Sequence, residues 1–327
     1  MDEDEVKTVL ANWQGKIESL AIVGVFSSLK NDQELLVEKW AKEILGESIP
    51  ISCSSQIGSV GLLERENATI LNAALDKVMA LTSSGFERAL KSEGINDAEI
   101  YLCQNDGTLM SIEYAKRFPI LTIACGPTNS IRGASYLARI TNAIVLDVGG
   151  TTSDLGVLAD GFPRESSIAV DVGGIRTNFR MPDIVSIGLG GGSIVREVGD
   201  QVTVGPDSVG YKITEEARVF GGKQLTTTDI AVRLGLADIG DKTLVEDVPL
   251  ELAEKAYATI KQMTEEAIDK MKTSSGDVDL ILVGGGAIII PQELAGVANV
   301  YHNPHGGVAN AIGASIAPVS YTHLTLP

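Results

Sequence analysis

The sequence predicts an α/β fold, because strand-type and helix-type segments alternate along its 327 residues. Short apolar runs at 20–26, 49–54 and 278–283 have the composition of buried strands, whereas 66–89 and 249–272 are amphipathic and helical in period. Between 143 and 170 the pattern shortens to strands separated by glycine turns, which is typical of an antiparallel meander. We therefore expect helices packed on sheets, with antiparallel strands in the central part of the chain.

Capping residues and apolar runs predict the remaining elements, which follow here in chain order. Asn31 and Glu34 form a capping-box pattern for a helix that Gly46 ends. Pro127 suits the first turn of a helix that runs to about 140. Asp229 is interpreted as a cap in the first turn of a short helix. Further strands are expected at 99–103, 121–124, 184–189 and 194–198, an apolar stretch at 287–290, and a helix of small residues at 306–317.

Composition limits the partners. The formal net charge is −17 and the pI is near 4.6, so the surface repels nucleic acid and anionic lipid, and neither is an expected partner. Three widely spaced cysteines (Cys53, Cys103, Cys125) fit reduced thiols better than a disulfide framework. No stretch has the length of a membrane span and the first residues lack a basic, apolar leader. These features predict a cytoplasmic protein.

The strongest motif for chemistry is the segment IVLDVGGTTSDLGVL at 144–158. A strand delivers Asp147, which can hold Mg²⁺ through water, and Gly149 and Gly150 let backbone N–H groups approach phosphate oxygens. Thr151 and Thr152 add hydroxyl donors. The alternative is a plain hairpin in which the same residues serve only the turn.

Two further glycine runs are candidate binding loops. Gly284, Gly285 and Gly286 follow the strand at 278–283, where bare backbone could lie against a purine and its ribose. A second run, followed by a serine, could cradle a phosphate or an acyl phosphate. Its residues are Gly190, Gly191, Gly192 and Ser193. For Gly284–Gly286 the alternative is a strand-to-loop connection that only uses the permissive backbone of glycine, and for the second run it is a tight connection between two buried strands. For the 306–317 helix the alternative is close packing on a neighbour.

Other site chemistries are excluded or set aside. The chain has no P-loop motif, no paired histidines and no CxxC spacing. His302 and His305 are interpreted as surface loop residues, and Asp183 as a turn residue or a further acidic candidate. No catalytic residue can be assigned.

The order of these elements resembles that of the actin-like ATPases, in which a DxGGT turn, a later GGG adenosine loop and a small-residue helix follow one another. Five blocks resemble the hydantoinase A/5-oxoprolinase family more specifically. They are CGPTNSIRGAS at 125–135, DVGGTTSD at 147–154, MPDIVSIGLGGGS at 181–193, VGPDSVG at 204–210 and TTTDI at 226–230. With the two later segments, the resemblance covers about 20–317.

The resemblance implies an actin-like ATPase fold with ribonuclease-H-like sheets. It also implies ATP and Mg²⁺ as cofactors, and a subunit that opens a cyclic amide of the hydantoin or 5-oxoproline type by phosphorylating the amide oxygen. A subunit of an ATP-dependent ketone carboxylase is the alternative, and a second enzyme subunit is an implied partner. A sugar or acid kinase fits the five blocks less well, and a non-catalytic remnant of the fold stays open.

The sequence departs from the family at both ends. Family members open with their own DxGxT turn, and none precedes Asp147, so the sequence suggests a fragment truncated at both termini. We expect a partial N-terminal lobe at 1–120, an ATPase lobe at 121–318, and a non-native, poorly ordered tail at 319–327 that packs against nothing. Asp147 and Gly284–Gly286 should face each other across one interlobe cleft. The isolated chain is expected to show no substrate-dependent ATP turnover, because half of its phosphate cradle is absent.

Overall fold

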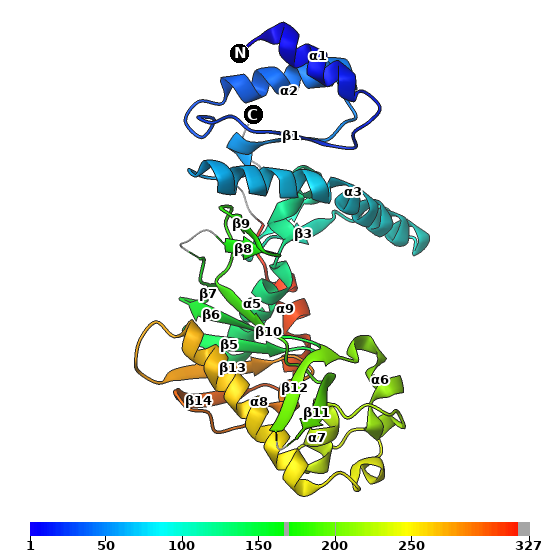
Figure 1. The fold of residues 1–327 in the computed structure, drawn as a ribbon, viewed down its shortest axis with the longest axis vertical. Helices are drawn as coiled ribbons and strands as arrows, with labels where there is room; N and C mark the ends of the chain where they lie inside the picture. Colours follow the sequence, from blue (N-terminus) through cyan, green and yellow to red (C-terminus); the bar gives the residue numbers. More distant parts are fainter. Residues whose placement is uncertain (167–169, 200, 320–327) are drawn as a thin grey trace. The chain divides into compact units, whose positions relative to one another are not determined.

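The computed structural model describes residues 1–166, 170–199 and 201–319 (Figure 1). The chain divides into two compact units. Unit 1 contains residues 1–125, 165–181 and 318–327, and unit 2 contains residues 126–164 and 182–317. Each unit has buried hydrophobic clusters of its own, so each is described separately.

Unit 1 begins with a small layer of helices on a two-stranded parallel sheet. The helices are α1 (Glu3–Trp13) and α2 (Asp32–Leu45), and the strands are β1 (Leu20–Ile22) and β2 (Ile51–Cys53). Leu10, Trp40 and Cys53 are part of the core between them. Cys53 is a buried thiol whose pKa burial raises to about 12, and among the described residues none of the three cysteines is in a disulfide.

The rest of unit 1 is arranged around one long helix, α3 (Leu62–Ser92). Two hairpins, β3 (Tyr101–Cys103) with β4 (Leu109–Ser111) and β8 (Val170–Val172) with β9 (Ile175–Thr177), accompany it, together with α4 (Ile112–Arg117). The backbone of Val319 forms an isolated bridge with Leu109. The expectation that the tail packs against nothing therefore fails at its first residue, and 320–327 lie outside the described residues.

Unit 2 contains a six-stranded mixed sheet with the order β10-β6-β5-β13-β14, in which β7 also pairs with β6. The strands are β5 (Ala143–Val148), β6 (Ser153–Ala159), β7 (Phe162–Pro163), β10 (Ile184–Ile187), β13 (Val278–Val283) and β14 (Val297–His302). β6 is antiparallel to β5, β7 and β10, whereas β13 is parallel to β5 and β14. The predicted meander is therefore the antiparallel half of this sheet.

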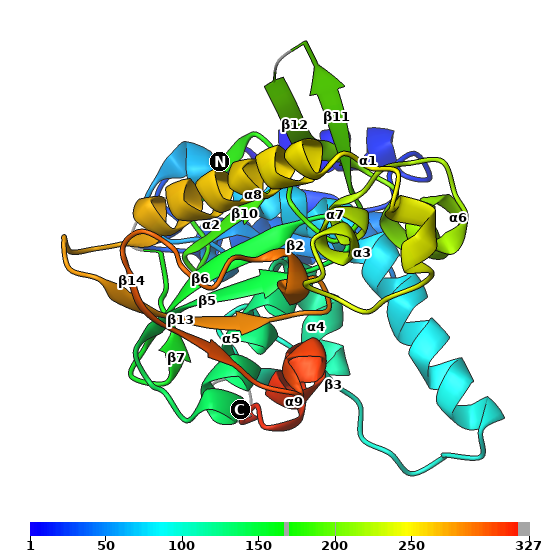
Figure 2. The same ribbon diagram turned by 90° about the horizontal axis from the view of Figure 1, so that it is seen from below.

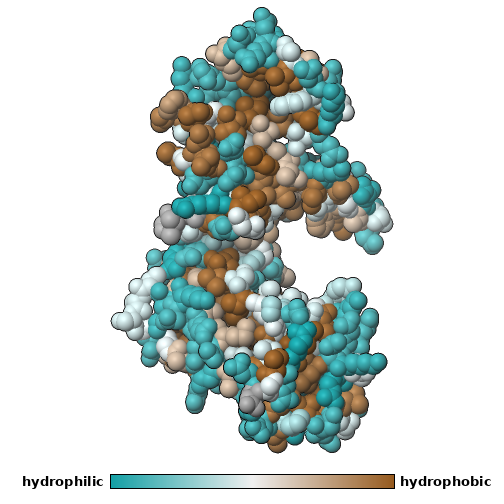
Figure 3. All heavy atoms as spheres, viewed as in Figure 1, coloured by the Kyte–Doolittle hydropathy of each residue, from teal (hydrophilic) through white to brown (hydrophobic). Residues whose placement is uncertain are grey.

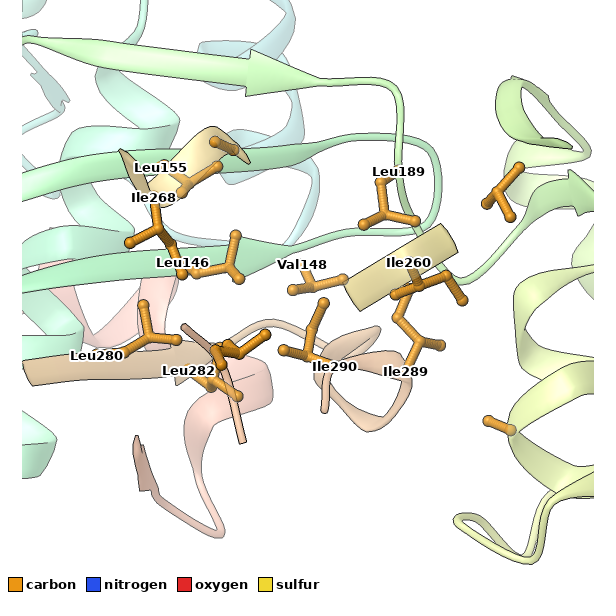
Figure 4. Close-up of a cluster of buried hydrophobic side chains, with 14 of the residues drawn as sticks. Leu146, Val148, Leu155, Leu189, Ile260, Ile268, Leu280, Leu282, Ile289 and Ile290 are labelled. Carbon is orange, nitrogen blue, oxygen red and sulfur yellow. The ribbon is translucent and has the colours of Figure 1, made fainter. Parts of the chain in front are cut away.

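Helices cover both faces of the sheet, as Figure 2 shows: α8 (Leu250–Met271) on one face, and α5 (Cys125–Ala138) with α9 (Ala309–Ser315) on the other. Alternation along the strands supplies both cores. Leu146, Leu280 and Ile268 belong to the larger cluster on the α8 face (Figure 4). Val145 and Ile281 belong to the cluster that includes Ile131 of α5.

The small-residue helix packs as the sequence suggested. An added Cβ at Gly313 would collide with the backbone of Asn129, and one at Gly133 with that of Ala309. These glycines let α5 and α9 approach to backbone contact. Outside the sheet, unit 2 also carries α6 (Ile213–Glu216), α7 (Thr227–Arg233) and the hairpin of β11 (Ser193–Val198) and β12 (Gln201–Ser208).

Two local predictions in unit 1 are wrong. Asn31 precedes α2 but its side chain makes no capping hydrogen bond. Glu34 instead accepts hydrogen bonds from Gly24 N, Ser55 N and the Ser54 hydroxyl, because it is buried beside the ends of β1 and β2. The strand expected at 121–124 is replaced by a 3-10 helix at Pro119–Thr122.

The surface is mixed in character. Figure 3 shows apolar residues gathered beside β1 and α2, where Val25, Phe26 and Leu29 are exposed on the connection between these elements. Among the helices of the described residues, none combines the length and the apolar composition needed to cross a bilayer.

Candidate functional site

The predicted site residues gather at one edge of the sheet in unit 2. β5, β10, β13 and β14 run in the same direction, so their carboxyl ends lie at the same edge. The turns that leave this edge include all three glycine-rich segments, at 149–152, 188–192 and 284–286. Carboxyl ends of such strands are the usual position of ligand sites in open α/β sheets.

The first turn connects β5 to β6 and is closed by one hydrogen bond, from Gly149 N to Thr152 O at 2.9 Å. Gly150, Thr151 and Thr152 are exposed. Within the described residues, their N–H groups have no protein acceptor. Successive free N–H groups of this kind form an anion-binding concavity. The turn can therefore offer three donors to phosphate oxygens.

The second turn, Gly284–Gly286, lies directly beside the first, since Val283 and Asp147 are partners in the parallel register. Gly284 has a φ of +87°, and an added Cβ would collide with a carboxylate oxygen of Asp147. Gly286 N donates to Val148 O at 2.8 Å, and a Cβ at Gly286 would lie 2.6 Å from Gly149 O. Glycine is required here by the close approach of the two turns.

The third segment, Gly190–Ser193, packs against the first turn. Gly191 N donates to Gly149 O at 3.0 Å and Gly192 N to Gly150 O at 2.7 Å. Ser193 N donates to Gly190 O, while the buried Ser193 hydroxyl accepts from Gly190 N at 2.8 Å. These four N–H groups are engaged within the protein. In this geometry the segment holds the carbonyl side of the first turn and leaves the opposite side open.

A row of polar side chains crosses the sheet next to the first turn. Asp154 of β6 is the cross-strand partner of Asp147, and Ser186 of β10 is the partner of Asp154. The Ser186 hydroxyl donates to Asp154 Oδ1. Burial raises the pKa of the Asp154 carboxyl, the Ser186 hydrogen bond opposes this shift, and the charge of Asp147 adds to it. Two carboxylates therefore lie side by side at the turn.

This pair can contribute to a magnesium site. Mg²⁺ commonly takes one or two protein carboxylates and completes its octahedron with water and substrate phosphates. Among the described residues, no group of three or more His, Cys, Asp or Glu side chains could hold a metal ion by itself. Asp147 with Asp154 thus fits an ion that is shared with a phosphate ligand.

A cavity of about 430 Å³ is lined in part by the second turn. Gly284 and Gly285 form one wall, and other parts come from α8, the end of β14 and the following loop. The polar side chains in its lining are Tyr257, Gln292, His302 and Asn303. The 284–286 loop therefore contacts the first turn and also lines a pocket with the volume of a small ligand.

The structure contradicts one prediction about these residues and confirms another. Asp147 and Gly284–Gly286 do not face each other across an interlobe cleft, because they lie on adjacent strands of one sheet in one unit. Asp229 serves the helix cap as predicted: it is the third residue of a capping box whose N-cap is Thr226, and its carboxylate accepts from Thr226 N. Asp183 pairs with Arg164.

Sequence reasoning missed two residues of this edge. Asp154 was within the motif, and its position opposite Asp147 follows from a hairpin whose strands pair at Val148 and Ser153. His302 had been interpreted as a loop residue, but it is the last residue of β14 and lines the cavity. The pairing of β14 with β13, which depends on long-range contacts, places it there.

Comparison with known proteins relates this geometry to a family. The hydantoinase/oxoprolinase family model matches residues 65–240. The chain is 26% identical over 249 residues to the acetophenone carboxylase gamma subunit of Aromatoleum aromaticum, covering 72% of this chain and 33% of the relative. It is 27% identical over 295 residues to the 5-oxoprolinase of Dictyostelium discoideum, covering 81% of this chain and 22% of the relative.

A solved structure supports the same relationship at the level of the fold. The ATP-dependent caprolactamase from Pseudomonas jessenii superimposes with a TM-score of 0.75 at 18% identity, over 97% of this chain and 50% of that chain. The chain thus spans a third or less of the length of these two curated relatives and half of the solved structure. Because the family match extends over more than half of its residues, this chain belongs to the hydantoinase/oxoprolinase family.

Proposed function

We propose that this chain is the nucleotide-binding part of an ATP-dependent enzyme subunit and that unit 2 has an actin-like ATPase fold. The sheet order β10-β6-β5-β13-β14, with β6 as the antiparallel member of these five strands, supports a ribonuclease-H-like sheet. The neighbouring turns of β5 and β13 support a site that is shared between phosphates and nucleoside.

The observation that carries this proposal is the carboxylate pair beside a turn with exposed N–H groups. Asp147 and Asp154 would hold Mg²⁺, and the N–H groups of Gly150, Thr151 and Thr152 would bind phosphate oxygens. The ion would neutralise phosphate charge during transfer. Gly190–Ser193 would act indirectly, because their hydrogen bonds fix the shape of the turn.

The nucleoside would occupy the cavity beside Gly284 and Gly285. The cavity is apolar over much of its lining, including Leu236, Ile288 and Ile290, and this suits a purine and ribose. Gly285 is exposed, and none of the described residues comes within 4 Å of a Cβ added there, so bare backbone is available to a flat ligand.

For the reaction, we propose transfer of the γ-phosphoryl group to the oxygen of a cyclic amide, with release of ADP. Water would then add to the activated carbon, and the ring would open with loss of phosphate. The family and its relative 5-oxoprolinase support this reading. A ketone carboxylase subunit, in which an enolate oxygen is phosphorylated, is equally supported by the acetophenone carboxylase relative, whose name also supports a partner subunit.

Calorimetric titration with ATP, with and without Mg²⁺, tests the nucleotide site. We expect binding to require Mg²⁺ and to weaken tenfold or more in Asp147→Ala, because a charge-assisted ligand to the metal is lost. Asp154→Ala should behave in the same way, and Asp97→Ala, an exposed carboxylate in unit 1, should bind as the unmodified protein does. Equal affinities in all four proteins would exclude the metal role.

The two reactions differ in their products. ATP hydrolysis stimulated by 5-oxoproline or a hydantoin, with ring-opened product, would identify the amide hydrolase. Stimulation by a ketone together with bicarbonate, with label from bicarbonate in the product, would identify the carboxylase.

A further inference from the structure

One pair of side chains in the cavity has the chemistry to distinguish nucleobases, an inference that rests on the nucleotide site proposed above. Of the four polar side chains in the lining, Asn303 is already engaged: its Nδ2 donates to Leu137 O at 3.2 Å and its Oδ1 accepts from His305 N at 2.9 Å. Tyr257 is half-buried, and burial raises its pKa, so the phenol stays protonated near neutral pH. Gln292 differs from Asn303 in its carbonyl oxygen, which accepts no hydrogen bond from any of the described residues.

Gln292 is held by His302. Gln292 Nε2 and His302 Nε2 lie 2.9 Å apart, and both residues line the cavity. An amide nitrogen has no lone pair that can accept, so the amide must donate and the imidazole nitrogen must accept. The other ring nitrogen, Nδ1, then carries the hydrogen. In this tautomer the hydrogen bond keeps the amide nitrogen, rather than the amide oxygen, facing His302, and both side chains are exposed.

With one N–H used by His302, Gln292 keeps its carbonyl oxygen and a second N–H. That combination matches adenine, which offers an N6–H donor next to the N7 acceptor, and a glutamine amide can bind both. Guanine presents the O6 acceptor in place of the N6 amino group, and a carbonyl oxygen facing it would lose its hydrogen bond. The fixed orientation of the amide therefore discriminates between the two purines.

We propose that Gln292 is the specificity-determining residue for adenine in this site, and that His302 is a positioning residue that sets the orientation of its amide. His302 can do this because it ends β14, whose pairing with β13 places it beside the nucleoside loop. Gln292 follows the 3-10 helix Ala287–Ile289, which continues directly from Gly286. The selecting pair and the loop are thus parts of one local structure.

The test compares the dissociation constants of Mg-ATP and Mg-GTP, measured by calorimetry on the full chain. We expect ATP to bind about tenfold more tightly than GTP in the unmodified protein. Gln292→Leu should reduce this ratio to near one, mainly by weakening ATP binding. Gln262→Leu, an exposed glutamine on α8 that pairs with Glu266 instead, is the matched control and should keep the ratio.

Variants of His302 separate positioning from structure. His302→Ala frees the amide to rotate and should lower the ratio severalfold, whereas His302→Gln retains an acceptor and should restore part of it. Asp147→Ala should weaken ATP and GTP equally, so the phosphate side is measured independently of the base side. A ratio that Gln292→Leu leaves unchanged, or a preference for GTP in the unmodified protein, would overturn the assignment while the nucleotide site stands. Failure to bind either nucleotide would overturn both.

Discussion

Asp154 carries a carboxylate that its surroundings disfavour in the charged form. Burial is the largest cause of its raised pKa, and the neighbouring Asp147 charge adds to it, while the hydrogen bond from Ser186 opposes the shift. A raised pKa in the folded state means that the folded protein binds more protons than the unfolded chain just above the usual Asp value of 3.8. Stability therefore falls as the pH rises through this window, and the cost remains at neutral pH. Such a cost is typical of groups that are kept for binding.

Replacing Asp154 with asparagine should separate stability from binding. Asp154→Asn removes the disfavoured charge, so we expect a gain of about 1 kcal/mol at pH 7, or about 2–4 °C in Tm, that shrinks as the pH is lowered toward 4. The same variant should bind Mg-ATP at least tenfold more weakly. Thermal unfolding across pH and calorimetry measure the two effects, with Asp97→Asn as the exposed control. A variant that is less stable than the unmodified protein at pH 7 would contradict this reading of Asp154.

At the scale of elements, the edge of the sheet depends on glycines for two different reasons. Gly190, Gly284 and Gly286 are needed because neighbouring backbone leaves no room for a Cβ. Gly285 is different: its Cβ would meet nothing within 4 Å, and its φ is not in the left-handed region. A side chain at 285 should therefore be compatible with the fold and should extend into the space that we assign to the nucleoside.

Gly285→Val is accordingly a steric test of the base side. We expect the free energy of unfolding to change by less than about 1 kcal/mol, because the added side chain displaces no contact among the described residues. Mg-ATP binding should be lost or should weaken at least tenfold. Gly276→Val, which is also unobstructed and has no positive φ, is the matched control and should leave binding unchanged. Unchanged affinity in folded Gly285→Val would place the nucleoside elsewhere.

The same elements show what sequence can and cannot predict here. Val278–Val283 is a strand with the predicted bounds, and the turn after Asp147 is where its glycines suggested, because both follow from local pattern. The neighbours of these turns were not predictable in the same way. That Gly191 and Gly192 hydrogen-bond to Gly149 and Gly150 depends on the pairing of β10 with β6, which joins segments about 30 residues apart, whereas the position of Asp154 opposite Asp147 follows from the local hairpin of β5 and β6.

At the scale of the whole molecule, the candidate site belongs to only one of the two units among the described residues. Unit 2 holds every residue of the candidate site, including the 190–193 and 284–286 segments. Unit 1 contains a buried network in which Arg65 donates to Ser54 Oγ and to the carbonyl of Gly24, and Glu34 accepts from Ser54. This network braces the ends of β1 and β2, and capping-box rules alone could not have predicted it, since it joins residues 41 positions apart.

The most direct measurement of the central claim is a crystal structure of the chain with Mg²⁺ and a non-hydrolysable ATP analogue. We predict the ion beside the carboxylates of Asp147 and Asp154, phosphate oxygens within hydrogen-bond distance of the N–H groups of Gly150 to Thr152, and the base in the cavity lined by Gly285 and Gln292. A nucleotide bound away from the carboxyl edge of β5 and β13, or an ion with neither carboxylate near it, would contradict the account.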